Sequence, residues 1–79
     1  MKPRRQPYGD KNICGANIER IRRALGMKQR ELAEQMQIRG VDINLSSLSK
    51  IEGQQRAVTD IELQAIAAIL NVEIEELFP

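Results

Sequence analysis

The chain has 79 residues, 42% of them hydrophobic, a length that suits one domain near the lower limit for a self-sufficient core. It contains no histidine and a single cysteine, which excludes imidazole catalysis, cysteine or histidine zinc sites and an intrachain disulfide. No Gly-rich phosphate loop is present, so we expect no enzyme activity, no catalytic residue, no metal and no cofactor.

Charge is spread unevenly along the chain, although the net charge is only +1. Residues 1–30 carry nine basic and two acidic residues, whereas residues 57–79 carry five acidic and no basic ones. A molecule polarised in this way can turn a positive face towards phosphate while its other end repels it. The alternative is a segregated surface that serves only solubility.

No apolar run approaches the roughly 20 residues that a membrane span needs, and no signal peptide is visible. We therefore expect a cytoplasmic protein with no membrane partner.

Residues 1–14 read as a basic, flexible N-terminal arm, and residues 15–79 as the folded domain. Pro3, Pro7 and Gly9 interrupt any regular period in the arm. Disorder without a partner is the usual state of such a terminus, and the alternative is an arm that wraps DNA.

Two helices are predicted next along the chain. The first begins at Ala16, carries an apolar stripe and ends at Gly26, because glycine commonly follows a helix. The second runs from about Lys28 to Gln37. Residues 39–43 then form a connector.

Asn44 is expected to cap a third helix over residues 45–52, with Gly53 closing it. This helix has a buried stripe and offers small polar side chains and one lysine on its other face. Such a face suits the base edges of a DNA major groove. The alternative is an ordinary surface helix.

The sequence from Thr59 to Glu62 is a capping box that opens a fourth helix, and a short fifth helix is expected at about residues 74–78. The expected fold class is therefore all-α with five helices. The fourth helix has a second apolar stripe, which predicts a homodimer interface unless the fifth helix and the arm cover it. The stripe consists of Ile61, Ala65, Ala68, Ile69 and Val72.

Several segments in order resemble one known family. They are Ile21-Arg22, Gln29 to Ala33, Leu48 to Gly53, Ile66 to Val72, and Glu75 to Phe78. Together they are similar to the Cro/CI-type helix-turn-helix domain of the xenobiotic-response-element family, found in bacterial and phage transcriptional regulators. The resemblance covers residues 16–78. It implies a lambda-repressor-like fold whose helix at about 45–52 lies in the major groove, in dimers that read paired half-sites.

The resemblance also implies roles for individual residues. Base contacts are expected from the exposed positions of the recognition helix, namely Asn44, Leu45, Ser46, Ser47 and Lys50. Phosphate contacts are expected from Lys28, Gln29, Arg30 and Arg56, with plain solvation as the alternative. Arg22 and Glu52 are expected to form a partly buried, structural ion pair.

The chain departs from the family pattern in two places. The stretch from Ala33 to Glu52 is about five residues longer than in compact phage repressors, and Lys28 stands at a helix start where Ser or Thr is usual. The first departure bears on the angle of the recognition helix, and the second predicts a weaker cap.

The predicted function is a sequence-specific, double-stranded-DNA-binding regulator, most simply a repressor. One alternative is the antitoxin of a toxin–antitoxin pair, with a toxin as protein partner. Another is a protein-interaction module that has lost DNA binding.

Overall fold

A computed structural model describes residues 6–79, and over this range the chain is helical without strands. Its elements are α1 (Gly15–Ala24), α2 (Gln29–Ile38), α3 (Leu45–Glu52), α4 (Asp60–Leu70) and the 3-10 helix η1 (Ile74–Leu77). A short helix lies where the fifth was expected, at about residues 74–78, but it is a single 3-10 turn, so the count of five α-helices is not confirmed. The backbone bonds of this turn join residues three apart, from Glu76 N–H to Glu73 O and from Phe78 N–H to Glu75 O.

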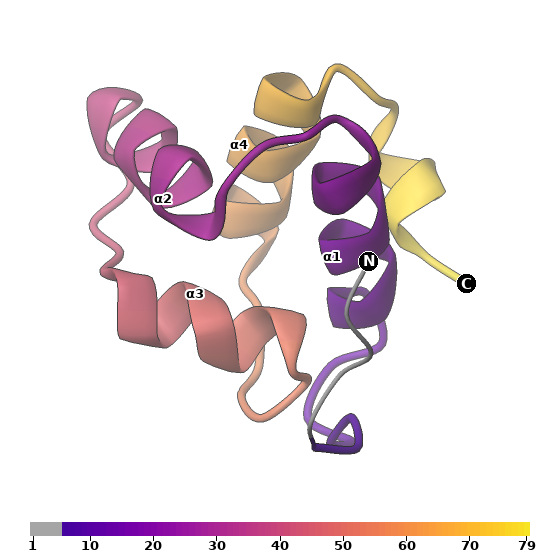
Figure 1. Cartoon of the computed structure of the whole chain (residues 1–79). Helices are drawn as coiled ribbons and strands as arrows, with labels where there is room; N and C mark the ends of the chain where they lie inside the picture. Colours follow the sequence, from indigo (N-terminus) through magenta and orange to yellow (C-terminus); the bar gives the residue numbers. More distant parts are fainter. Residues whose placement is uncertain (1–5) are drawn as a thin grey trace.

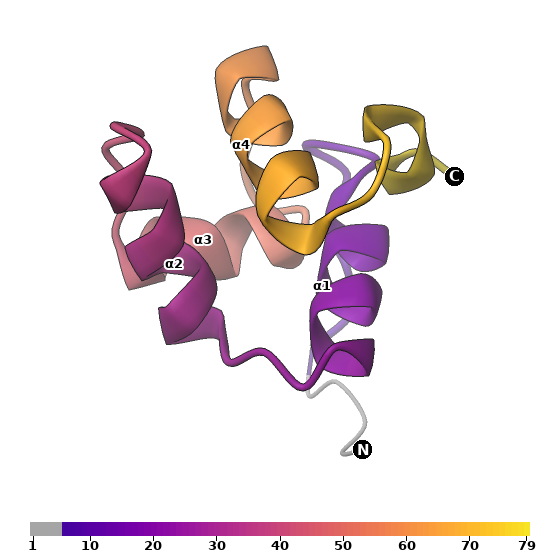
Figure 2. The ribbon, with the colours of Figure 1, turned by 90° about the horizontal axis from the view of Figure 1, so that it is seen from above.

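The helices enclose one core (Figure 1). α4 packs against α1, α2 and η1, while α3 packs across α1 and α2. Figure 1 shows α2 and α3 on one side of the molecule and η1 on the other, and the view from above in Figure 2 agrees. The surface formed by α2 and α3 is therefore separated by α1 and α4 from the C-terminal end.

The core is aliphatic, as the scarcity of aromatic residues requires. Tyr8 and Phe78 both remain exposed. The fully buried hydrophobic side chains come from all four α-helices and η1, and include Ile18, Leu32, Met36, Leu48, Ile51, Ile66 and Leu77. Burying each such side chain contributes roughly 1.5–3 kcal/mol, so the helices are held mainly by this shared core.

Three helices begin largely as the sequence predicts. The Asn44 side chain accepts a bond from Ser47 N–H at 2.7 Å, and Thr59 and Glu62 form the reciprocal capping box of α4. At α2, the Glu31 carboxylate accepts from Lys28 N–H at 2.9 Å. Since a lysine ammonium has no acceptor, the reciprocal bond is missing, and this cap is one-sided.

α3 ends at Glu52 with Gly53 as its C-cap, as predicted. Gly53 has an ordinary φ of −81°, and the residue in the left-handed conformation is Gln54, with φ 58°. Gln54 N–H bonds to Ile51 O and Gln55 N–H to Lys50 O, the pattern that usually places glycine at the left-handed position. Gln54 therefore occupies the left-handed position after the C-cap, where a residue other than glycine has a conformational penalty.

The N-terminal segment also differs from the expected flexible arm. Residues 1–5 of that arm lie outside the described residues. From Gly9 to Cys14, however, the backbone follows the end of α3 and enters α1, with Gly9 N–H bonded to Gly53 O at 2.8 Å. These residues are part of the packed structure.

No helix in residues 6–79 is both long and apolar enough to cross a membrane. Within the same range, no cluster of three or more cysteine or acidic side chains is arranged to hold a metal ion.

Candidate nucleic-acid interface

α3 has two distinct faces. Leu48, Ile51 and Glu52 are buried against the rest of the molecule. Ser46 and Lys50, four residues apart, lie on the opposite face and are exposed. The hydroxyl and the ammonium therefore point together into solvent from one side of a short, fixed helix.

The start of α3 holds the remaining predicted base-contact residues. Asn44 and Leu45 are exposed, and Ser47 is half-buried. The Asn44 side-chain oxygen is used by the Ser47 amide, so its side-chain NH₂ group is the part available to another acceptor. Asn44 is thus a donor in this arrangement, whereas the Leu45 side chain offers an apolar surface of the kind that packs on a thymine methyl.

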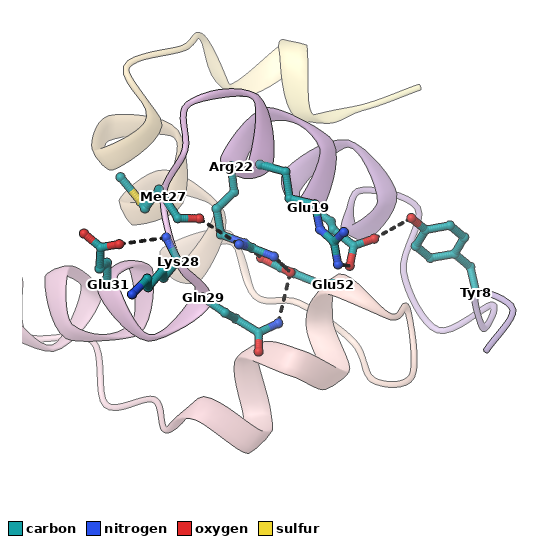
Figure 3. A network of polar contacts seen from close by, with 9 residues as sticks. Tyr8, Glu19, Arg22, Met27, Lys28, Gln29, Glu31 and Glu52 are labelled. Atoms are coloured by element: carbon teal, nitrogen blue, oxygen red, sulfur yellow. Dashed lines mark hydrogen bonds and ion pairs between the residues drawn. The ribbon is translucent and has the colours of Figure 1, made fainter. Parts of the chain in front are cut away.

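The C-terminal end of α3 is tied to α1 through a buried ion pair (Figure 3). Arg22 Nε lies 2.7 Å from Glu52 Oε2, and Arg22 Nη2 donates to Glu52 Oε1 at 2.9 Å. Arg22 Nη1 also donates to the backbone oxygen of Met27 at 2.8 Å. Two parallel bonds fix the orientation of both side chains, so the pair holds the angle between α1 and α3.

Gln29 joins this network from the first turn of α2. Its Nε2 donates to Glu52 Oε1 at 3.0 Å, as Figure 3 shows. The side-chain NH₂ group has two hydrogens, so one bond to Glu52 leaves a second hydrogen for another acceptor. Glu52 thus fixes Gln29 beside α3.

The two basic residues predicted to contact phosphate at the start of α2 are exposed to solvent. Lys28 and Arg30 are exposed on either side of Gln29. Their positive charges lie at a helix N-terminus, where the backbone amides and the helix dipole also favour an anion.

Arg56, one of the predicted phosphate contacts, is already paired with an acidic side chain of the protein. Its Nη2 lies 2.7 Å from Glu62 Oε2, and its Nη1 donates to Ala57 O. Burial by itself raises the pKa of Glu62, but hydrogen bonds from Arg56 and the Thr59 amide, with the attraction of the Arg56 charge, lower it below its usual value. An external phosphate would have to share Arg56 with this carboxylate.

The apolar stripe expected on α4 is only partly accessible. Ile61 and Ala68 are exposed, whereas Ala65 is buried and Ile69 and Val72 pack partly against the core. Ile61, Ala65 and Ala68 also line a shallow groove shared with Arg39 and Val41 of the connector. The long connector thus contributes to the surface beside α4.

Two features of the site were not predicted. Ser49 is exposed on α3, and helical periodicity could have placed it beside Ser46, three residues earlier. Asn12 binds the last turn of α3 and Gln54 binds the N-terminal segment, each through side-chain hydrogen bonds, and no local signal identifies either of them.

Comparison with known proteins agrees with this geometry. A protein-family model described as helix-turn-helix matches residues 18–77. The restriction-modification controller protein C.AhdI from Aeromonas hydrophila has a similar structure, with a TM-score of 0.72, 28% identity, and coverage of 82% of this chain and 91% of that one. The DNA-binding domain of BldD gives a TM-score of 0.69 and 27% identity, covering 85% of this chain and 90% of its own. No curated protein sequence matches the chain.

Proposed function

Because this chain belongs to the Cro/CI-type helix-turn-helix family, which consists of DNA-binding regulators rather than enzymes, we propose that it reads specific double-stranded DNA and represses transcription. The reading element is α3, lying in the major groove.

The exposed face of α3 is the observation that carries this proposal. Ser46 and Lys50 point away from the core, and Glu52 at the end of the same helix is locked to Arg22. Side chains on a rigid element can meet base edges without a large ordering cost. Hydroxyls bond several base edges, and lysine favours guanine, so this face is suited to sequence-dependent contacts.

The start of α2 supplies the phosphate contacts of the proposal. Lys28 and Arg30 are exposed there, and Gln29 is oriented by Glu52. These contacts hold the register of α3 on the duplex without reading sequence themselves. Arg56 is the weakest of the four candidates because Glu62 already binds it.

We further propose that two copies pair through α4 and read two half-sites. Exposed Ile61 and Ala68 supply the apolar surface that supports this proposal, and Ile61 also lines a second groove with Ile74 of η1. Sedimentation at micromolar concentration tests it, with and without DNA. A monomer under both conditions, even at saturating DNA, would refute the dimer.

The decisive experiment is selection of bound sequences from a randomised duplex pool, followed by fluorescence anisotropy at two or more salt concentrations. We expect one recurrent sequence and a logarithm of the binding constant that falls linearly with the logarithm of salt concentration. Failure to enrich any sequence would refute sequence-specific binding.

Two variants separate reading from positioning. Arg30→Ala should weaken binding to all duplexes and reduce the salt slope by about 1, whereas Lys50→Ala should relax base preference at one position of the site. Arg20→Ala is the matched control. Arg20 bonds Asn17, which bonds Leu77 of η1, so it lies on the side of α1 away from α2 and α3.

A further inference from the structure

Asn12 connects the start of α1 with the end of α3 and the loop after it, which are far apart in the sequence. Its Oδ1 accepts from the backbone amides of Cys14 and Gly15 at the start of α1. Its Nδ2 donates to Ile51 O at 3.0 Å and to Arg56 O at 2.8 Å, so it grips the last turn of α3 and the loop after it. One amide side chain therefore uses both of its donors and its acceptor between these segments.

Gln54, directly after the C-cap of α3, bonds back to the N-terminal segment and to α1. Its Nε2 donates to Gly9 O at 3.2 Å and to Asn12 O at 2.7 Å, and its Oε1 accepts from Ala16 N–H at 3.3 Å. Backbone bonds add to it, since Lys11 N–H donates to Gln54 O at 3.0 Å. We call residues 9–14 together with Gln54 the clasp.

The close packing of the clasp is built into the sequence through glycine. A Cβ atom on Gly9 would overlap Gln54 O, and one on Gly15 would overlap Ile51 O. The two backbones can approach each other only because both side chains are absent.

The identity of residue 54 also needs an explanation. Glycine adopts a φ of 58° without strain, and Gln54 occupies this position at a cost on the order of 1 kcal/mol. Its three side-chain hydrogen bonds, with Gly9, Asn12 and Ala16, offset this cost. Residues 9–14 lie outside the part that the helix-turn-helix family model matches, which begins at residue 18.

We propose that the clasp fixes the tilt of α3 and that Asn12 and Gln54 are positioning residues for DNA reading. This inference rests on the proposed function. α3 has only 8 residues and is about 12 Å long, so a small rotation at its clasped end moves every exposed side chain on it. Loosening the clasp should therefore weaken base reading more than phosphate binding.

Two variants loosen the clasp in different ways: one leaves the backbone strain at Gln54 in place, and the other relieves it. Asn12→Asp keeps the Oδ1 acceptor for α1 but replaces the donor to Ile51 O and Arg56 O with a second oxygen. Gln54→Gly removes the side-chain bonds and relieves the left-handed strain. Thr59→Ala is the matched control, because it removes one helix-cap bond from α4 and does not touch the clasp.

The first readout is the specificity ratio, measured by anisotropy on the selected duplex and on a scrambled duplex, with every variant shown by circular dichroism to be fully folded. We expect both clasp variants to bind the selected duplex on the order of tenfold more weakly, the effect of about one good base contact. Binding to the scrambled duplex should change less than about twofold, because the phosphate contacts at the start of α2 remain. Thr59→Ala should leave the ratio unchanged.

The second readout is amide hydrogen exchange in the free protein. We expect the amides of Gly53, Gln54 and Gln55 to exchange on the order of tenfold faster in the clasp variants, with α4 amides changing only as far as global stability changes.

The outcomes separate the two proposals. Wild-type protein that selects a sequence, with clasp variants that keep the full specificity ratio, would overturn the positioning role and leave the proposed function intact. An equal loss of affinity for both duplexes would mean that the clasp contributes only to stability, and this result would also overturn the positioning role. A wild-type protein that selects no sequence would overturn both proposals.

Discussion

Glu52→Ala is the most informative single substitution, because Glu52 connects three helices at one buried point. Its side chain is fully buried and accepts from Arg22 twice and from Gln29 once. Truncation would leave the guanidinium of Arg22, a residue only 6% exposed, without its two bonds to carboxylate while its bond to Met27 O remains.

The size of the effect follows from this burial. Removing one partner of a buried pair costs roughly 3–5 kcal/mol, since the other charge stays desolvated and unpaired. A domain of 79 residues is stable by roughly 4–12 kcal/mol in total. For a domain of this size, 1 kcal/mol corresponds to about 4–8 °C, so we expect the melting temperature to fall by roughly 12–40 °C.

Urea denaturation and thermal melting followed by circular dichroism measure this directly. Glu34→Ala, the same substitution at an exposed position of α2, is the control and should change stability by less than about 0.5 kcal/mol. The double variant Arg22→Met, Glu52→Leu should recover much of the loss, because apolar replacement of a buried pair removes the stranded charge. A melting temperature for Glu52→Ala within a few degrees of wild type would refute the structural role of the pair.

Three further predictions follow from single residues. The pKa of Glu62 in the folded protein lies below its ordinary value of 4.5. The ionised carboxylate therefore stabilises the fold fully above about pH 4.5, and this contribution is lost as pH falls through the folded-state pKa. Acid unfolding of Glu62→Gln should show a shallower pH dependence in this range. Burial raises the pKa of the Cys14 thiol, so a thiol reagent near neutral pH should react slowly with native protein and rapidly in denaturant, and equal rates would contradict this burial. Gly15→Ala should lower stability by about 1–3 kcal/mol in urea denaturation because of the overlap with Ile51 O, although alanine normally favours a helix, and a stabilised variant would disprove the close approach.

Much of the helical framework could be read from the sequence, because its signals act over one turn. Asn44 caps α3 by bonding an amide three residues later, and Thr59 and Glu62 do the same for α4. The buried stripe predicted for the third helix is likewise present as Leu48 and Ile51, since helix geometry alone decides which side chains share a face.

The prediction of the Arg22–Glu52 pair did not rest on local signals. Its partners are 30 residues apart, and only the resemblance to the Cro/CI-type family pointed to them. Nothing in the local sequence distinguishes Glu52 from an exposed acidic residue, because burial depends on what packs above it.

The sequence by itself determined the four α-helices, the N-caps of α3 and α4 and the outward face of α3, since these features depend on residues that are close neighbours along the chain. Only the tertiary structure decided that residues 9–14 are docked, that Gln54 rather than Gly53 takes the left-handed conformation, and that Glu62 binds Arg56. Gly9 and Gln54 are 45 residues apart, and Asn12 and Arg56 are 44 apart. Contacts over such separations form only once the shared core has brought α1 and α3 together, which is why no local pattern reveals them.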